Sequence, residues 1–287
     1  MGEGLELFTM GTWVLVLAYL TSTIGVFVGV TSARKMRTTS NSRLRSYWSV
    51  LAALVSGGVG IWLAVFLPMV GFAVDGSAVR YDMLTIAFSM LVAVVSVFVA
   101  LAVALPAEGS GGPGRRIAGA LVLGAGLAAV PFTILWAVRI QGTLDFDPMW
   151  LLGALALALV TAVGFMAQVE TADTWPKRLL SSALAGAAVI AVHFLTGASV
   201  GVTVDPAVPA PTGIEVFSIL FPLFVVGLLL LAVPIVAVLL TPDRVAAQLE
   251  REVDAWIAEG EGAGSTTAPA TSPSGDRAGR DVAAPTH

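Results

Sequence analysis

Long apolar stretches alternate with short polar segments along most of the chain. Seven of these stretches approach the ~20 apolar residues that a membrane-spanning helix needs. We expect the spans at residues 9–31, 48–73, 83–105, 117–139, 149–169, 179–202 and 216–240. The pattern therefore predicts an all-α, seven-helix membrane domain over residues 9–240, preceded by a short outer N-terminus of residues 1–8.

The basic residues indicate which way the helices run. Lys and Arg concentrate in alternate loops and in the C-terminal tail, and the positive side of a membrane protein faces the cytoplasm. This predicts an N-terminus outside the cell and a C-terminus in the cytoplasm. The residues that carry the bias are Arg34, Lys35, Arg37, Arg43, Arg45, Arg115, Arg116, Lys177, Arg178, Arg244, Arg251, Arg277 and Arg280.

The opposite, outer loops are short and acidic. Two of them end in an aromatic–Asp pair, Tyr81-Asp82 and Phe146-Asp147, directly before a predicted helix. An Asp at a helix start accepts hydrogen bonds from the first backbone N–H groups and faces the positive end of the helix dipole. We therefore expect both to be helix caps.

The amino-acid composition excludes several classes of protein and of chemistry. Hydrophobic residues make up 57% of the chain and charged residues 12%, whereas soluble domains carry about 25% charged residues. The absence of cysteine excludes disulfides and thiolate chemistry. The spans contain no deep carboxylate and no Ser-His-Asp or His-Glu group. We expect no enzyme and no nucleic-acid partner, but a multi-pass protein of the plasma membrane whose surroundings are the lipid bilayer.

The segment after the last span has two predicted parts. Residues 241–259 form an amphipathic cytoplasmic helix in which Val245, Leu249, Val253 and Trp256 recur at helical spacing. This helix packs on the protein's own cytoplasmic face or binds a partner protein through residues 243–259. Residues 260–287 are rich in Gly, Ser, Thr, Pro and Ala, which predicts a disordered tail. We expect no output domain within this chain.

One local pattern occurs three times, in the second, fourth and sixth spans. In each, a helix rich in small residues leads to an aromatic residue. The aromatic residue and the position before it are Val65-Phe66, Pro131-Phe132 and His193-Phe194. We predict three repeated helix pairs, with an unpaired seventh helix after them.

His193 is the chemically distinctive member of this set. An ionisable side chain inside an apolar span is costly, which makes it a functional-site candidate. One interpretation is a hydrogen bond to a neighbouring helix, for which Thr196, Ser199, Thr133 and Tyr19 are candidate partners. The other is a metal site with Met69 and Met90, because imidazole and thioether are suitable ligands for Cu(I). Methionine also fills irregular gaps in helix bundles without binding anything.

The repeated stretches resemble the MHYT domain, a seven-helix bacterial membrane module named for Met-His-Tyr-Thr. The resemblance covers about residues 8–240 and rests on Gly60-Ile61-Trp62, Gly126-Leu127-Ala128-Ala129 and the three motif copies. It implies a metal, with copper the expected one, and sensing of oxygen, carbon monoxide or nitric oxide. The motif histidine is kept only as His193, since Val65 and Pro131 replace the other two, and the motif threonine is kept as Thr133.

The sequence supports three functional interpretations. The first is a sensory or ligand-binding membrane protein that acts through a cytoplasmic partner. The second is a carrier or channel for a small neutral solute, with a cavity between the second, fourth and sixth helices. The third is a structural membrane protein with a degenerate site.

Overall fold

The computed structural model describes residues 5–6, 11–106 and 112–240. The chain separates into a unit of Met1–Val238, which contains the membrane spans, and a second unit of Leu239–His287. The helix predicted at 241–259 and the tail predicted at 260–287 both lie outside the described residues.

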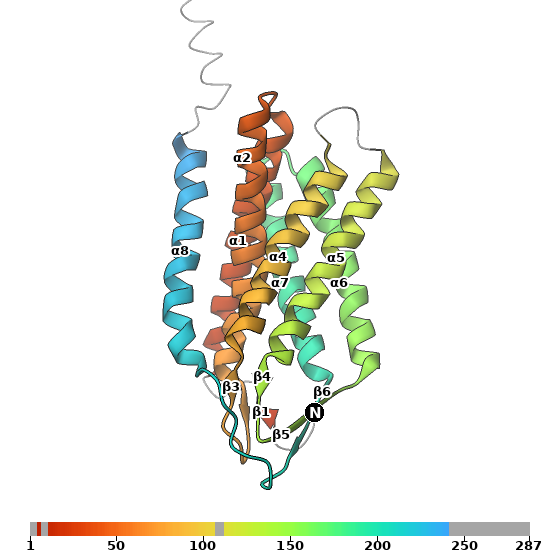
Figure 1. The fold of residues 1–287 in the computed structure, drawn as a ribbon. Coiled ribbons are helices and arrows are strands. Elements are labelled where there is room, and N and C mark those ends of the chain that lie inside the picture. Colours follow the sequence, from red (N-terminus) through yellow and green to blue (C-terminus); the bar gives the residue numbers. More distant parts are fainter. Residues whose placement is uncertain (1–4, 7–10, 107–111, 241–287) are drawn as a thin grey trace, which may run out of the picture. The chain divides into compact units, whose positions relative to one another are not determined.

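The described residues contain seven helices long and apolar enough to cross a membrane, as the hydropathy pattern predicts. Figure 1 shows them side by side. The second span is composite, running through α2 (Ser42–Ala53), η1 (Leu54–Leu63), α3 (Ala64–Phe66) and η2 (Leu67–Gly71). The other six are α1 (Trp13–Thr38), α4 (Met83–Ala104), α5 (Pro113–Trp136), α6 (Pro148–Thr171), α7 (Trp175–Ala198) and α8 (Val216–Leu240).

The first six spans close into a bundle around a buried centre. Helix α1 packs on η1 and α7, α4 packs on η1 and α5, and α6 packs on both α5 and α7. The short α3 reaches α5 and α7 as well, so the second, fourth and sixth spans meet inside the bundle. These are the three spans that carry the motif copies.

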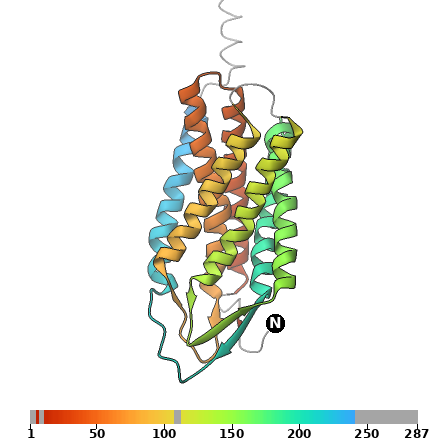
Figure 2. The ribbon, with the colours of Figure 1, turned by 45° about the vertical axis from the view of Figure 1, so that its right-hand side comes forward.

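Helix α8 is peripheral. A Cβ added to Gly227 would lie 2.4 Å from the Leu63 side chain, so α8 leans on the second span. Most of its other apolar side chains, including Phe217, Phe221 and Phe224, are exposed. Figure 2 likewise shows α8 on the flank of the second span, away from α6. An apolar helix exposed in this way is typical of one that faces lipid.

Two glycine contacts set the position of the second span. A Cβ on Gly25 would lie 2.4 Å from the Gly60 backbone nitrogen, so α1 and η1 cross in direct backbone contact. A Cβ on Gly57 would lie 2.6 Å from the Ala93 carbonyl oxygen of α4. The small-residue face predicted for this span is therefore used for close helix packing.

The middle of the second span departs from α-helical geometry. Leu54–Leu63 form a π-helix of 10 residues, a form that is rare and usually limited to a single turn. The Ser22 hydroxyl on α1 donates to the Gly60 carbonyl oxygen over 2.6 Å. This bond satisfies a backbone acceptor that would be costly to bury unpaired.

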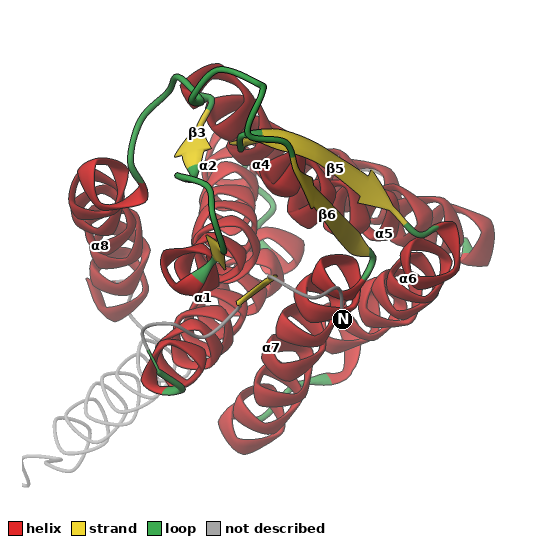
Figure 3. Ribbon diagram, turned by 90° about the horizontal axis from the view of Figure 1, so that it is seen from below, coloured by secondary structure: helices red, strands yellow, loops and turns green. Residues whose placement is uncertain are grey.

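The loops at one end of the bundle contain short strands in addition to the helices that the sequence predicts. Three two-stranded antiparallel sheets join them, and Figure 3 shows the strands at one end of the bundle. Pairing between the strands provides hydrogen-bond partners for many backbone N–H and C=O groups of these loops, which would otherwise bond to water. The pairs are β1 (Leu5–Glu6) with β2 (Ala73–Val74), β3 (Arg80–Tyr81) with β4 (Val138–Arg139), and β5 (Gly142–Phe146) with β6 (Val200–Val204).

Both predicted aspartate caps are present. The Asp82 carboxylate accepts from the Leu84 and Thr85 backbone N–H groups, and the Asp147 carboxylate accepts from Met149. The backbone N–H of Asp82 donates to the Ala137 carbonyl oxygen over 2.9 Å. That of Asp147 likewise donates to Ser199 over 2.8 Å. Each aspartate thus starts one helix and also caps the end of α5 or α7.

The Asp82 cap predicts an acid-dependent loss of stability. Hydrogen bonds, the largest contribution coming from the Thr85 backbone N–H, hold the pKa of the Asp82 carboxyl below its ordinary value. Its contribution is therefore present above the unfolded-state pKa of about 4 and is lost as the pH falls through the lower folded-state pKa. Thermal unfolding in detergent between pH 6 and pH 3 should show a steeper loss for the wild type than for Asp82→Asn. Parallel curves would contradict this.

Candidate functional site

His193 lies in α7, five residues before the helix ends at Ala198. Its side chain is 4% exposed, and its Nδ1 atom is buried without a hydrogen-bond partner among the described residues. The imidazole meets the Phe194 ring edge-on, with the ring centroids 5.1 Å apart. A buried polar atom without a partner is uncommon in native proteins and marks a place where a ligand or a water molecule can bind.

Three of the four hydroxyl groups proposed as partners of His193, those of Thr196, Ser199 and Thr133, are engaged elsewhere. Thr196 donates to the Val192 carbonyl oxygen over 2.9 Å, and Ser199 donates to Thr196 over 2.6 Å. Thr133 donates to the Ala129 carbonyl oxygen over 2.7 Å. Each hydroxyl thus bonds within its own helix region, as Ser and Thr commonly do. The structure does not supply the predicted interhelical bond to Nδ1.

The other two motif positions are buried and apolar. Val65 on α3 is fully buried, and Pro131 on α5 is also buried. Because α3 packs against both α5 and α7, the segments that carry Val65, Pro131 and His193 meet in the bundle. One imidazole therefore stands where the family motif would place three.

The three motif aromatic residues have different surroundings. Phe66 is fully buried and stacks on Trp62, with the ring centroids 5.5 Å apart. Phe132 is half-buried and packs against Phe146 at 5.1 Å, close to the strand end of the bundle. Phe194 is half-buried and packs beside His193. Of these three aromatic rings, Phe194 is therefore the one that packs against the His193 imidazole.

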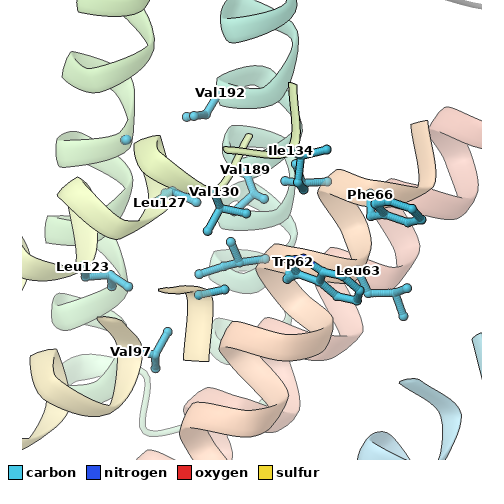
Figure 4. Packing of buried hydrophobic residues seen from close by; sticks show 14 of the residues in the cluster. Trp62, Leu63, Phe66, Val97, Leu123, Leu127, Val130, Ile134, Val189 and Val192 are labelled. Atoms are coloured by element: carbon cyan, nitrogen blue, oxygen red, sulfur yellow. The ribbon is translucent and has the colours of Figure 1, made fainter. Parts of the chain in front are cut away.

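The centre between the second, fourth and sixth spans is a packed apolar core. Figure 4 shows Trp62 and Phe66 of the second span, Val130 of α5 and Val192 of α7 among the packed side chains of this core. All four side chains are almost completely buried. The carrier interpretation expected a cavity here, and the structure has side chains in contact instead.

The predicted metal ligands do not form a single group. A Cβ added to Gly58 would lie 4.0 Å from the Met90 methyl group, so the end of Met90 lies beside Gly58. Met69 is eleven residues farther along the same span, which corresponds to ~16 Å at 1.5 Å per residue. Gly58, beside Met90, is therefore about three helical turns away from Met69. Among the described residues there is also no group of three His, Cys, Asp or Glu side chains that could hold a metal.

Two hollows on the molecule lie away from His193. One of about 190 Å³ lies at the strand end and is lined in part by Trp136, Arg139 and Phe146. The other, of about 230 Å³, lies between α5 and α6 and ends at the Arg116–Glu170 ion pair, 2.9 Å long. Neither includes a motif histidine, so His193 remains the chemically distinctive group of the bundle.

Sequence reasoning missed one polar contact in the core. The Trp62 indole N–H donates to the Ser89 hydroxyl of α4 over 2.8 Å, and both residues are buried. A tryptophan in the middle of a span needs an acceptor for its N–H, which is the signal that could have indicated this bond. The contact ties the second span to α4 one turn below Phe66.

Comparison with known proteins supports the resemblance. A model of the MHYT family, described as a bacterial signalling protein N-terminal repeat, matches residues 47–119. A bifunctional diguanylate cyclase/cyclic di-GMP phosphodiesterase, MucR of Pseudomonas aeruginosa, is 28% identical over 143 residues. That match covers 48% of this chain and 20% of MucR, so the chain spans about a fifth of that relative's length. No solved structure matches.

The family match begins at Tyr47 in α2 and ends at Gly119 in α5, so it contains the second span, α4 and the start of α5. The Gly57–Ala93 contact, the Trp62–Ser89 bond and the Asp82 cap all lie in this region. The seven apolar helices and the match to a bacterial signalling family both indicate a bacterial membrane protein. Residues 47–119 therefore match an MHYT domain, and the chain is a multi-pass bacterial membrane protein.

Proposed function

We propose that this protein is a membrane sensor in which His193 binds the ligand. The match of residues 47–119 to a bacterial signalling family supports the sensory role. The observation that carries the assignment to His193 is its buried Nδ1 atom without a partner, at the motif position of α7. The predicted orientation, with the arginine-rich end in the cytoplasm, would place His193 toward the outer side and its output toward a cytoplasmic partner.

The chemistry of the residues limits the ligand. A neutral imidazole offers one donor and one acceptor nitrogen, so His193 can bind one metal ion or one small polar molecule. Imidazole and thioether suit Cu(I), and we propose His193 with Met69 as the pair that would hold it. Bound copper would supply an open coordination position for a diatomic gas. Met90 is excluded from this pair by its place beside Gly58.

Copper content of the detergent-purified full chain tests this proposal. We expect wild-type protein loaded with Cu(I) to retain about one copper per chain after desalting, and His193→Ala to retain none. Met69→Leu should lower copper retention, because a thioether ligand is lost. Met90→Leu is the matched control and should retain copper like the wild type, because Met90 lies elsewhere.

Two results would contradict the proposal. The first is a wild-type protein that does not retain copper and whose unfolding temperature copper does not change. The second is equal copper retention by wild type and His193→Ala. The first would favour a small polar ligand at His193 or a degenerate structural site, and the second would place the metal elsewhere.

A further inference from the structure

Three arginines converge at the end of the bundle opposite the strands, where α1 and α6 end and α7 begins. Arg34 and Arg37 of α1 each donate through a guanidinium nitrogen to the Val169 carbonyl oxygen near the end of α6, both over 3.0 Å. Arg178 of α7 donates to the Thr31 hydroxyl of α1 over 3.2 Å. We call Arg34, Arg37 and Arg178 the arginine cluster.

Among the described residues, no salt bridge balances the charges of the arginine cluster. Arg37 and Arg178 both lie close enough to Arg34 to repel it electrostatically. The nearby carboxylate of Asp173 attracts Arg34, but it already pairs with Lys177 over 3.0 Å. Within the described ranges, no arginine of the cluster takes part in a salt bridge.

The arginine cluster also has more donors than acceptors. Each guanidinium carries five N–H donors in a planar fork. The acceptors found for the three side chains are one backbone carbonyl and one hydroxyl. The Nε atom of Arg178 is buried and has no partner among the described residues. Buried donors of a charged group are costly to leave unpaired, so an additional acceptor is expected here.

Other arginines at the same end show that this imbalance is specific. Arg45 is one cation that donates to three carbonyl oxygens, those of Met36, Leu105 and Pro106. Arg116 pairs with the Glu170 carboxylate over 2.9 Å. A general preference for basic residues at this end explains their number, but it does not explain why three of them share so few acceptors.

The start of α7 adds to the same electrostatic field. Arg178 is the fourth residue of this 24-residue helix, and the N-cap residue Thr174 makes no side-chain cap hydrogen bond. Pro176 has no backbone N–H, so the backbone N–H groups of Trp175 and Lys177 and the positive end of the dipole are what this helix start offers an anion. The cluster lies near the end of α1 and the start of α7, which is the depth of lipid headgroups for helices that span the bilayer.

We propose that the arginine cluster binds a phosphate group. A phosphate provides several charge-assisted acceptors, matches the guanidinium fork and neutralises the mutual repulsion of the three cations. Basic pockets between membrane helices bind phospholipid headgroups on the cytoplasmic side. The same chemistry would bind a free phosphate from the cytoplasm, and titration with each source separates the two. The site is distinct from His193 and does not depend on the sensory proposal.

Thermal unfolding of the full chain in a neutral detergent tests this site. Phosphatidylglycerol, phosphatidylcholine and inorganic phosphate are each titrated, with sodium chloride matched for ionic strength. We expect phosphatidylglycerol to raise the unfolding temperature of the wild type by several degrees, because a ligand that binds the folded state stabilises it. Arg178→Gln and Arg34→Gln should need about tenfold more ligand for the same shift.

Arg43→Gln is the matched control, because it removes one exposed positive charge at the same end from outside the cluster. It should respond like the wild type. A response to phosphatidylglycerol alone assigns a lipid headgroup, and an equal response to inorganic phosphate assigns a free phosphate; both support the site. If the cluster variants respond like the wild type, or if Arg43→Gln loses as much as they do, the site does not exist.

A second measurement covers the case in which a cluster variant fails to fold. It uses the wild type only and compares inorganic phosphate with chloride at equal ionic strength, and phosphatidylglycerol with phosphatidylcholine. If the cluster binds phosphate, inorganic phosphate should stabilise the protein more than chloride does, or phosphatidylglycerol more than phosphatidylcholine, or both. Equal curves in both comparisons overturn the proposal.

Discussion

Replacing Gly25 by alanine is expected to destabilise the bundle by about 1–3 kcal/mol, the usual cost of forcing extra atoms into a packed core. The new Cβ would lie 2.4 Å from the Gly60 nitrogen and 2.5 Å from its Cα, both backbone atoms of η1. A backbone cannot rotate away as a side chain can, so α1 and the second span must separate. Thermal unfolding in detergent measures the effect as a fall of several degrees.

Gly164→Ala is the matched control for this prediction. Gly164 lies in α6, and a Cβ built there meets no heavy atom within 4 Å. Alanine favours the helix more than glycine does, so the control should be as stable as the wild type or slightly more stable. Equal destabilisation by both substitutions would show that the Gly25–Gly60 crossing is not the tight contact that the structure describes.

Features that depend on one residue and its nearest neighbours in sequence could be predicted. Hydropathy found all seven spans, because the cost of burying polar backbone and side chains acts on every residue of a span. Asp82 and Asp147 were predicted as caps because the bonds reach only two or three residues along the chain. The orientation of the helices and the repetition of helix pairs remain predictions.

Features that depend on contacts between residues far apart in sequence could not be predicted from the sequence. The strand pairs join residues such as Arg80 with Arg139, and no local signal indicates which loops will meet. The helix ends at the arginine-rich side run farther than hydropathy suggests, with α1 ending at Thr38 and α7 beginning at Trp175. Arginines there bond to carbonyl oxygens at neighbouring helix ends, which hydropathy does not register.

The candidate site shows the same division. His193 was found by sequence because a histidine in an apolar span is unusual in any fold. The surroundings of His193 were not predicted correctly. The hydroxyls of Thr133, Thr196 and Ser199, chosen as partners, bond instead to carbonyl oxygens on their own chain segments. The structure places Met90 beside Gly58.

Tyr81 connects the strand end to the core, and its truncation should have the largest effect. The side chain is 1% exposed, and its ring meets Phe66 edge-on with the centroids 6.3 Å apart. Its hydroxyl donates to the Met69 carbonyl oxygen over 3.2 Å, and its backbone pairs with Ile214 before α8. Truncating a buried aromatic residue costs about 3–5 kcal/mol, so Tyr81→Ala should unfold at a much lower temperature than the wild type.

Tyr81→Phe separates the hydroxyl from the ring. It keeps the packing and leaves the Met69 carbonyl oxygen without this donor, at a cost of about 1–3 kcal/mol. Burial raises the pKa of the Tyr81 phenol above its ordinary value. Its contribution is therefore fully present below the unfolded-state pKa of about 10 and is lost as the pH rises toward the higher folded-state pKa. Unfolding temperatures measured from pH 8 to pH 11 should fall more steeply for wild type than for Tyr81→Phe. If Tyr81→Ala is no less stable than Tyr81→Phe, the buried ring is not the connection between strand end and core.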